Sequence, residues 1–420
     1  MKHELLSMAG RNLSRHKRRT VVTAIALAVG VGLYIAMNSL MTGFTNLADQ
    51  NMKDYETGSA GFFAHGYWDE REQYPLDKLI EQPQQLIAAM DEQNIPAAPR
   101  TTFRGELIVH YDPFPEDGSL PMGFTAIDPE RDGQVFELRD NIRAGRWLES
   151  GEEVIIGGWL AERLGAQVGY TVSVTARTRD GFRQLMDLEI VGIYQTSNPM
   201  TDRHTVFVPL DLAEDYLEMQ GAVTAIYTLL PEQIPGTADL QPLQDIYASS
   251  GMQNEVELLG FTDMTAEFLE IEEMKDQSTA IIMFLLAIIA VVGISNTMLM
   301  SVLERQKEIG MMRSIGFRNG EIRRIFMYEA AGIGIIGATA GLVLGSSLVL
   351  LLTNYGIDYG ELMESTDLTA FRFEGVLYGV WDVPAMFSVA LFAIVTAAVV
   401  AALPTRQILR KSITACLRQS

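Results

Sequence analysis

Four apolar runs stand out in an otherwise charged sequence of 420 residues. Each run lacks Lys and Arg and is long enough to cross a bilayer as a helix, which takes roughly 20 apolar residues. The predicted spans cover residues 21–42, 278–302, 328–354 and 383–404. The first run follows the basic residues KRR, as a signal peptide would. Its apolar stretch is too long for a signal peptide, so we interpret it as a retained span.

The segment between the first two spans, residues 43–277, is too long for a loop and must fold as a domain. Strand-like and helix-like stretches follow one another in it, which predicts a mixed α+β domain with two lobes divided near residues 140–150. Expected strands are 61–68, 101–111, a hairpin of 172–176 with 188–192, the start of 205–219, and 222–230. Expected helices are 83–94, a short one ended by Gly165, one capped by Asp211, and 254–278, which continues into the second span.

The basic residues of the short flanks predict which way the spans point. Half of the 32 Lys and Arg residues lie in 1–20, 303–327 and 405–420, which places both termini and the connection 303–327 in the cytoplasm. The segments 43–277 and 355–382 then lie outside. They hold nearly all of the 53 Asp and Glu residues. Such an acidic exterior argues against nucleic-acid binding and against a surface that lies flat on anionic lipid.

The predicted fold class is therefore membrane α-helical, with four transmembrane helices arranged one plus three. A large α+β extracytoplasmic domain is inserted between helices one and two. The predicted order is a basic cytoplasmic N-terminal helix (1–20), the first span (21–42), the extracytoplasmic domain (43–277), the second span (278–302), a cytoplasmic helix (303–327), the third span (328–354), an external loop (355–382), the fourth span (383–404) and a cytoplasmic tail (405–420).

Candidate chemistry is sparse in this sequence. The single cysteine, Cys416, excludes an internal disulfide and a Cys-based zinc site, and the five histidines contain no HExxH pair. No lysine follows a glycine, so the Gly-Lys-Ser/Thr of a P-loop is missing. No span carries a buried acid or base of the kind that a proton-coupled carrier needs. We therefore expect no catalytic residue, metal or cofactor in this chain, and an energy source elsewhere.

Two motifs remain in the membrane part. Residues 304–317 read ERQKEIGMMRSIGF, a charged amphipathic segment between two spans. In the third span, Gly337, Gly341 and Gly345 are four residues apart and share one helix face. Missing side chains let another helix approach closely there, which is how helices associate in lipid.

Residues 294–345 resemble the core of FtsX-like (MacB-type) ABC transporter permeases: a span, an ER-x-x-E-I-G-x-x-R-x-x-G segment and a glycine-rich span. These positions are filled by Glu304, Arg305, Glu308, Ile309, Gly310, Arg313 and Gly316. The C-terminal ALPTRQILRKSITACLR and the N-terminal RNLSRHKRRTVVTAIALAVGVGLYI fit the same family. Within it, AMNSLMTGF (36–44) and EVIIGGWLAERLGAQVGYTVSV (153–174) are similar to lipoprotein-releasing (Lol) permeases. The turn 177–183 is short for one that docks a soluble chaperone.

The resemblance implies that 304–317 is a coupling helix seated in a groove on a separate ABC ATPase subunit. Two copies of that subunit would bind ATP and Mg²⁺. Ile309, Met312 and Ile315 would form an apolar edge, while Glu308 and Arg313 make polar contacts. The alternative is a helix that lies at the lipid surface. The expected coupling residues are Glu304, Arg305, Glu308, Ile309, Gly310, Met312, Arg313, Ile315 and Gly316.

The resemblance also implies a second permease, identical or homologous, in the bacterial inner membrane. ATP-driven motion would reach the outer domains by mechanotransmission. In a Lol-like protein, an outer-leaflet lipoprotein enters from lipid between the first two spans. Its expected path is Met37, Leu40, Met41, Phe44, Phe268 and Ile271, for which packing of a helix dimer is the competing interpretation. Alternative functions are a MacB-like exporter, an FtsX-like regulator of a periplasmic partner, an ATP-independent membrane sensor or scaffold, and a membrane enzyme.

Overall fold

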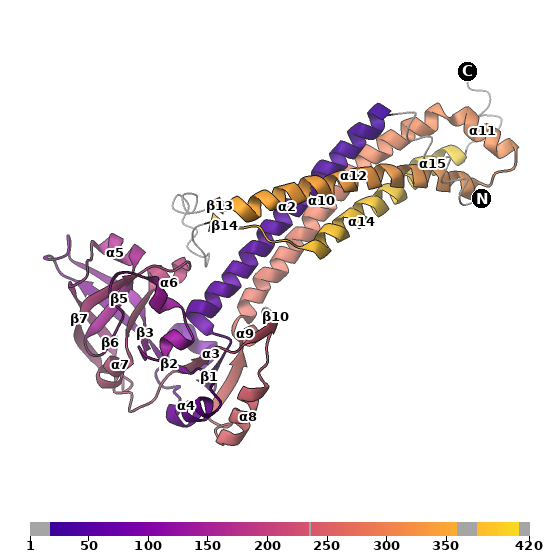
Figure 1. Cartoon of the computed structure of the whole chain (residues 1–420). Helices are drawn as coiled ribbons and strands as arrows, with labels where there is room; N and C mark the ends of the chain where they lie inside the picture. Colours follow the sequence, from indigo (N-terminus) through magenta and orange to yellow (C-terminus); the bar gives the residue numbers. More distant parts are fainter. Residues whose placement is uncertain (1–16, 235–236, 359–375, 411–420) are drawn as a thin grey trace. The chain divides into compact units, whose positions relative to one another are not determined.

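The computed structural model describes residues 17–234, 237–358 and 376–410. The chain divides into two compact units, whose helices and strands are drawn in Figure 1. A helical unit contains the described residues up to Thr45, those of 271–358 and those from Val376 onward. An α+β unit contains Asn46–Glu270. A large α+β domain is thus inserted after the first long helix, which confirms the predicted fold class.

The α+β unit is built on a ten-stranded sheet with order β12–β1–β9–β2–β3–β8–β5–β7–β4, in which β6 pairs with both β2 and β7. Its strands are β1 (Ala60–Ala64), β2 (Ala98–Val109), β3 (Gly118–Ile127), β4 (Ile142–Gly145), β5 (Glu153–Gly157), β6 (Thr171–Arg177), β7 (Arg183–Tyr194), β8 (Thr205–Pro209), β9 (Ala225–Thr228) and β12 (Val256–Gly260). The short strands β10 (Glu232–Ile234) and β11 (Thr237–Ala238) pair separately. Its helices are α3 (Tyr67–Glu70), α4 (Pro83–Glu92), α5 (Gly158–Leu164), α6 (Pro199–His204), α7 (Leu210–Leu217), α8 (Gln241–Ser250) and α9 (Phe261–Met264).

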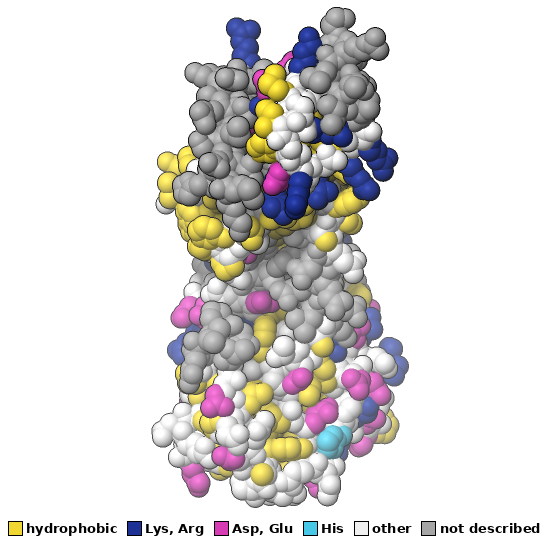
Figure 2. Space-filling view, turned by 90° about the vertical axis from the view of Figure 1, so that its right-hand side faces the viewer, with side chains coloured by type: hydrophobic (Ala, Val, Ile, Leu, Met, Phe, Trp, Pro, Cys, Tyr) yellow, Lys and Arg dark blue, Asp and Glu magenta, His cyan; other side chains and the backbone are white. Residues whose placement is uncertain are grey.

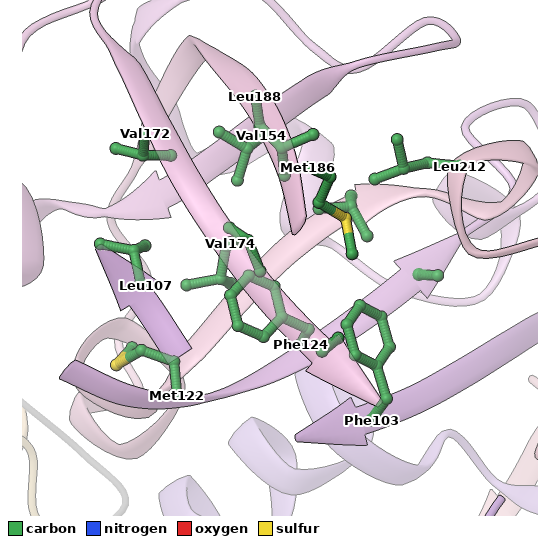
Figure 3. Close-up of a cluster of buried hydrophobic side chains, with 14 of the residues drawn as sticks. Phe103, Leu107, Met122, Phe124, Val154, Val172, Val174, Met186, Leu188 and Leu212 are labelled. Atoms are coloured by element: carbon green, nitrogen blue, oxygen red, sulfur yellow. The ribbon is translucent and has the colours of Figure 1, made fainter. Parts of the chain in front are cut away.

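The double pairing of β6 closes part of this sheet into a barrel. The strands follow one another as β2, β3, β8, β5, β7 and β6, and β6 returns to β2 through the residues Gly105–Ile108. Alternate residues point inward, so Val172 and Val174 are buried between partly exposed neighbours. Figure 3 shows them with Phe103, Phe124 and Leu188 in the barrel core, where the two phenylalanine rings stack with centroids 5.2 Å apart.

The remaining strands form a flank that shares β2 with the barrel. Residues Ala98–Arg100 of β2 pair with β9, which continues to β1 and β12. Helices α4 and α8 pack on this flank around a second apolar cluster. The predicted division of two lobes near residues 140–150 is therefore wrong. The flank takes strands from both ends of the unit, and β2 belongs to both parts.

Two further expectations about this unit need correction. The segment 254–278 is not one helix, because Val256–Gly260 form the edge strand β12 and the long helix begins only at Ala266. Asp211 does not cap α7: Pro209 holds the N-cap position, and Asp211 lies in the first turn. By contrast, Gly165 ends α5 with a φ of +65°, as its lack of a Cβ allows.

The helical unit consists mainly of helices. The long ones are α2 (Lys17–Met52), α10 (Ala266–Glu304), α12 (Asn319–Tyr355) and α14 (Val383–Val400), and the short ones are α11 (Gln306–Ser314) and α15 (Ala402–Leu409). The short strands β13 (Ile357–Asp358) and β14 (Val376–Leu377) pair beyond α12. Three helical stretches of the described part, Thr20–Thr57, Asn319–Tyr355 and Val383–Leu409, are long and apolar enough to cross a membrane. Several side chains of α10 lie outside the described set, so the second span stays a prediction.

The glycines of α12 lie against α2. A Cβ built on Gly337 would be 2.8 Å from Cβ of Leu27, and one built on Gly345 would be 2.8 Å from Cβ of Ile35. Gly341, between them, faces Val31 in the same way. The partner residues on α2 are also four apart, so this row of side chains fits against the row of glycines on α12.

Parts of the predicted organisation fall outside the described residues. These are most of the N-terminal helix (1–20), residues 359–375 of the external loop and residues 411–420 of the tail. The predicted single helix 303–327 is in fact the end of α10, the helix α11, a turn and the start of α12.

A buried ion pair ties β2 to the 3₁₀ turn Asp132–Gln134. Arg100 Nε and Nη2 donate to the two carboxylate oxygens of Asp132 at 2.7 and 3.1 Å, and both side chains are almost fully buried. Arg100 Nη1 donates to the carbonyl oxygen of Tyr55 at 3.1 Å, and the guanidinium lies 3.3 Å from the ring centroid of Phe136. Removal of one member would leave the other charge buried without its partner, which is strongly destabilising.

We expect Asp132→Asn to lower the free energy of unfolding by about 3 kcal/mol, because it leaves the Arg100 charge buried without its partner. The matched control is Asp91→Asn, which breaks a bidentate pair with Arg131 that is 32% and 46% exposed. That change should cost at most about 1 kcal/mol. Thermal unfolding of the full chain checks both, and equal shifts of the two midpoints would contradict the prediction.

We expect Gly341→Ala to lower the thermal midpoint of the protein in detergent. The added Cβ would lie 2.7 Å from Cβ of Val31 and 3.0 Å from the carbonyl oxygen of Ala28, so α2 and α12 must separate. In Gly293→Ala the new Cβ meets no described atom within 4 Å, and Ala is favoured over Gly in a helix by up to about 1 kcal/mol. This control should keep or raise the midpoint. A Gly341→Ala protein as stable as the control would rule out the tight contact.

Candidate coupling site

The segment that the sequence singled out folds into α11 between two sharp turns. Helix α10 ends at Glu304, and Arg305 leaves the helical conformation with φ −107° and ψ 22°. After α11, Gly316 adopts a φ of +102°, a left-handed conformation that favours glycine. The backbone N–H of Arg318 then donates to Glu321 at 2.9 Å, which caps the start of α12.

Arg305 holds α11 to the neighbouring helix. Its Nε donates to Glu308 Oε2 at 3.0 Å, and its Nη1 donates to Glu329 Oε2 of α12 at 3.1 Å. Its guanidinium also lies 5.6 Å from the ring centroid of Phe326. The side chains of Arg305 and Glu329 are only 14% and 6% exposed. Arg305 therefore positions α11 from within the unit.

One face of α11 is buried against the helical unit. Ile309 is 0% exposed, and the backbone of Gly310 is buried beside it. The same apolar cluster contains residues from the end of α10, from α12 and from α15: Val302, Ile322, Phe326, Ile408 and Leu409. Ile309 was expected on an apolar edge that meets a partner. The structure corrects this, because the side chain is enclosed by the chain's own helices.

The opposite face of α11 is open. Met311 is 56% exposed and Ile315 is 74% exposed. Met312, also expected on this edge, is half-buried against the apolar cluster, and Arg313 is half-buried too. Glu304 and Glu308 are exposed. Sequence reasoning missed Met311, although its four-residue spacing from Ile315 puts both on one helix face.

A basic cavity of about 200 Å³ opens beside the start of α12. It combines residues from α12 and α15, which the sequence gave no reason to bring together: Asn319, Gly320, Arg323, Arg406, Leu409 and Arg410. Within the described ranges, none of its three arginines has a carboxylate within 4 Å. Figure 2 shows Lys and Arg side chains gathered at the α11 end of the helices. Planar guanidinium groups in such a cluster suit an anionic partner.

The residues expected on a substrate path lie on α2 and α10. Met37 and Met41 are exposed, whereas Leu40 and Phe44 are half-buried. The side chains of Phe268 and Ile271 are outside the described set. Two apolar residues that precede them in the sequence belong to the α+β unit: Met264 is buried in an apolar cluster, and Phe261 packs on Ala48 and Met52.

An apolar cavity of about 370 Å³ lies within the helical unit. It is formed by α2, α10 and α14, with Leu27, Leu33, Ile294 and Phe392 in its lining. On α2 its lining ends at Leu33, so the expected path residues lie further along the helix. Sequence reasoning missed this cavity, because it depends on three helices that are distant in the chain.

The family models and the relatives that match this chain indicate the same family. Residues 280–413 match the family described as FtsX-like permease C-terminal, and residues 20–240, more than half of the chain, match the MacB-like periplasmic core domain. The lipoprotein-releasing system transmembrane protein LolC of Neisseria meningitidis serogroup B is 27% identical over 352 residues, covering 80% of this chain and 78% of that protein. An uncharacterized ABC transporter permease of Methanocaldococcus jannaschii is 22% identical over 391 residues, covering 89% of this chain and 90% of that protein.

The macrolide export ATP-binding/permease protein MacB of Psychrobacter cryohalolentis is 22% identical over 397 residues. The alignment covers 90% of this chain but 56% of that protein, so the chain spans little more than half of this relative. The two matched family regions follow the order seen in the structure, with the α+β unit before α10, α11 and α12. The chain therefore belongs to the FtsX-like (MacB-type) ABC transporter permeases.

Proposed function

We propose that the chain is the membrane subunit of an ATP-driven complex and that α11 docks on a separate ATPase. The observation that carries this proposal is the two-sided character of α11. Ile309 and the Arg305–Glu329 pair hold it to the helical unit, while Met311 and Ile315 expose their apolar side chains. Exposed apolar side chains beside charged ones are typical of a protein interface.

One feature of these 420 residues supports an ATPase carried outside them. They contain no Gly-Lys-Ser/Thr motif to cradle phosphates. The MacB relative is named as both ATP-binding and permease, and this chain aligns with only 56% of it. We infer that ATP and Mg²⁺ bind to two copies of an ATPase partner and that two permease chains, identical or homologous, complete the complex.

The helices supply a path for the motion. Closure of the ATPases would push on α11, and the Arg305–Glu329 pair would pass this push to α12. Helix α12 contacts α2 through its glycines. Helix α2 continues past Thr45, the last residue of the helical unit in this stretch, and ends at Met52 in the α+β unit. Helix α10 begins at Ala266 in the α+β unit and continues into the helical unit. We infer that force reaches the α+β domain along them, with α11 and both termini in the cytoplasm.

For the cargo, we propose a lipoprotein drawn from the outer leaflet of the inner membrane. Similarity to LolC supports this reading, and so do Met37 and Met41, which are 42% and 36% exposed on α2. Flexible Met side chains adapt to irregular apolar ligands. A MacB-like exporter or a regulator of a periplasmic partner is the second candidate, favoured by the MacB-like core domain that spans more than half of the chain.

We expect Met311→Asp combined with Ile315→Asp to reduce ATPase co-purification and ATP-dependent activity by at least about tenfold, because two carboxylates replace the apolar contact. Both side chains are exposed, so membrane insertion and thermal stability should not change. Leu229→Asp is the matched control, an exposed apolar side chain of the α+β unit. A double variant that still binds the ATPase as well as the control would refute the docking role of α11. Capture of no ATPase by the unmodified chain would favour a sensor or scaffold.

The cargo proposal is tested with one lipoprotein in acylated and unacylated forms. We expect the complex to retain the acylated form and to release it when ATP is added, since acyl chains supply the apolar contact with α2. The measurement is co-elution of each form with the complex before and after ATP. Equal retention of both forms would contradict lipoprotein extraction and favour the exporter or regulator.

A further inference from the structure

The last turn of α2 is joined to the barrel by two reciprocal hydrogen bonds. Asn51 Nδ2 donates to the carbonyl oxygen of Ser197 at 3.0 Å, and Ser197 Oγ donates to Asn51 Oδ1 at 2.6 Å. Ser197 lies on the connection between the barrel strands β7 and β8, and Asn51 is almost fully buried. Because an amide side chain donates and accepts at once, the two bonds fix both its position and its orientation.

A second link comes from the turn that follows α2. Residues Lys53–Thr57 form a π-helical turn, a rare element that is often found at functional sites. Glu56 Oε1 accepts a hydrogen bond from Asn198 Nδ2 at 2.7 Å. Asn198 is 0% exposed, and its Oδ1 caps α6 by accepting the N–H of Met200 at 3.1 Å. The same asparagine therefore connects the turn after α2 with the start of α6.

The π-helical turn also contacts the connection between β3 and β4. The N–H of Glu137 donates to the carbonyl oxygen of Asp54 at 3.0 Å, and Asn141 Nδ2 donates to the hydroxyl of Tyr55 at 3.2 Å. Strand β4 pairs with β7, so this connection is attached to the barrel at both of its ends. The chain that leaves α2 is thus bonded to the barrel at several consecutive residues.

The barrel segment between β7 and β8 is itself held in place. Both carboxylate oxygens of Asp202 accept the N–H of Thr196 at 3.1 Å, and Asp202 Oδ1 accepts the hydroxyl of Thr196 at 2.7 Å. The hydroxyl of Tyr194, at the end of β7, donates to the carbonyl oxygen of Thr205 at the start of β8, 2.7 Å away. Satisfied buried networks of this kind rigidify a structure. A displacement in the middle of the segment is therefore passed on to β7 and β8.

The covalent chain alone takes α2 only to the flank. After the π-helical turn the next strand is β1, which pairs with β9 and β12. The flank meets the barrel along β2, and in the described part of the chain residues 101–104 of β2 have no strand partner on the edge that pairs with β9 and β6. Without the links described above, a movement of α2 would reach the barrel only across this stretch.

We infer that Asn51, Glu56, Ser197 and Asn198 form a clamp through which α2 positions the barrel, so that barrel and flank follow α2 as one body. The role of this clamp in ATP-driven transport rests on the proposed function. The clamp itself is a property of the α+β unit, so it can be measured without an ATPase.

The clamp is opened by Asn51→Leu combined with Ser197→Ala. Apolar groups then replace both partners of the reciprocal bonds, which limits the loss of stability. The matched control is Thr228→Val. It removes a hydrogen bond of the buried Thr228, 2.7 Å long, to the carbonyl oxygen of Pro96 inside the flank. Thermal midpoints of the two variants show whether they are destabilised to a similar extent.

The first measurement is the distance between spin labels on the full chain in nanodiscs, by pulsed electron paramagnetic resonance in a Cys416→Ser background. One label pair joins α2 to α5, which packs on the barrel (Asn46→Cys with Glu162→Cys). The other pair joins α2 to α8 on the flank (Asn46→Cys with Gln244→Cys), and all three labelled side chains are exposed. We expect the opened clamp to broaden the distance distribution of the first pair only, and the control to broaden neither. An unchanged first distribution in the opened clamp would overturn the inference.

Variants of Glu56 test the second link by the same measurement. Glu56→Leu removes the acceptor for Asn198 and is expected to broaden the first distribution. Glu56→Gln keeps an oxygen acceptor of the same reach and should restore the distribution of the unmodified chain. Equal distributions for the two variants would contradict a role of Glu56 in the clamp. Because the reciprocal bonds are intact here, this pair also serves if the opened clamp does not fold.

The second measurement is the amount of acylated lipoprotein released per ATP hydrolysed by the complex. We expect the opened clamp to lower this ratio at least about threefold, as for substitutions along a coupling path, while ATPase co-purification persists because α11 is unchanged. The control Thr228→Val should keep the ratio. An unchanged ratio in the opened clamp would overturn its role in transmission. Absence of release from the unmodified chain would instead contradict the proposed function, and the spin-label result would still decide whether the clamp exists.

Discussion

Close backbone contact around α12 is the constraint on which the helical unit depends. Lipid removes most of the hydrophobic drive between helices, so association relies on small residues and tight packing. Helix α12 meets α2 through the row Gly337, Gly341 and Gly345, and it meets α14 through Gly334, where an added Cβ would lie 3.0 Å from Cβ of Ala397. With α12 fixed on both sides, the short turn at Gly316 and the Arg305–Glu329 pair fix α11. The exposure of Met311 and Ile315 follows from this chain of contacts.

The α+β unit is organised by a different constraint: one edge of β2 pairs with two different strands. Residues Ala98–Arg100 pair with β9, and Gly105–Ile108 pair with β6. The residues between these two stretches have no strand partner on that edge, and the N–H of Thr102 bonds to the Thr224 hydroxyl instead. A cavity of about 410 Å³ whose lining includes Pro99 and Thr101 lies at this junction. It is a product of joining a closed barrel to an open sheet.

The spacing of residues in the sequence predicted an element correctly wherever that element is determined by its own residues. Pro83 begins a helix, Val172 lies opposite Leu188 in a hairpin, and the four-residue glycine period matches a neighbouring helix. The family pattern likewise located the segment between α10 and α12. These signals are local, so a single sequence contains them.

Contacts between distant segments were not predictable in this way. The burial of Ile309 depends on Phe326 and Ile408, which come from two other helices, and nothing in its own motif indicates them. The segment that forms β12 was predicted to be helical. Its partner strand, β1, lies near the other end of the unit, so the local sequence does not show the pairing. The basic cavity between α12 and α15 has the same origin. Among the features that the sequence analysis missed, only the shared helix face of Met311 and Ile315 could have been predicted from residue spacing.

The pairing of β1 with β12 also sets the order in which the α+β unit can be completed. Ala60 pairs with Gly260, so this edge of the sheet must wait until almost the whole unit has been synthesised. Contacts this distant in sequence carry a large loop-closure cost and form slowly. The last strand to emerge, β12, leads through α9 directly into α10. Completion of the sheet therefore comes late in synthesis, immediately before α10 is made.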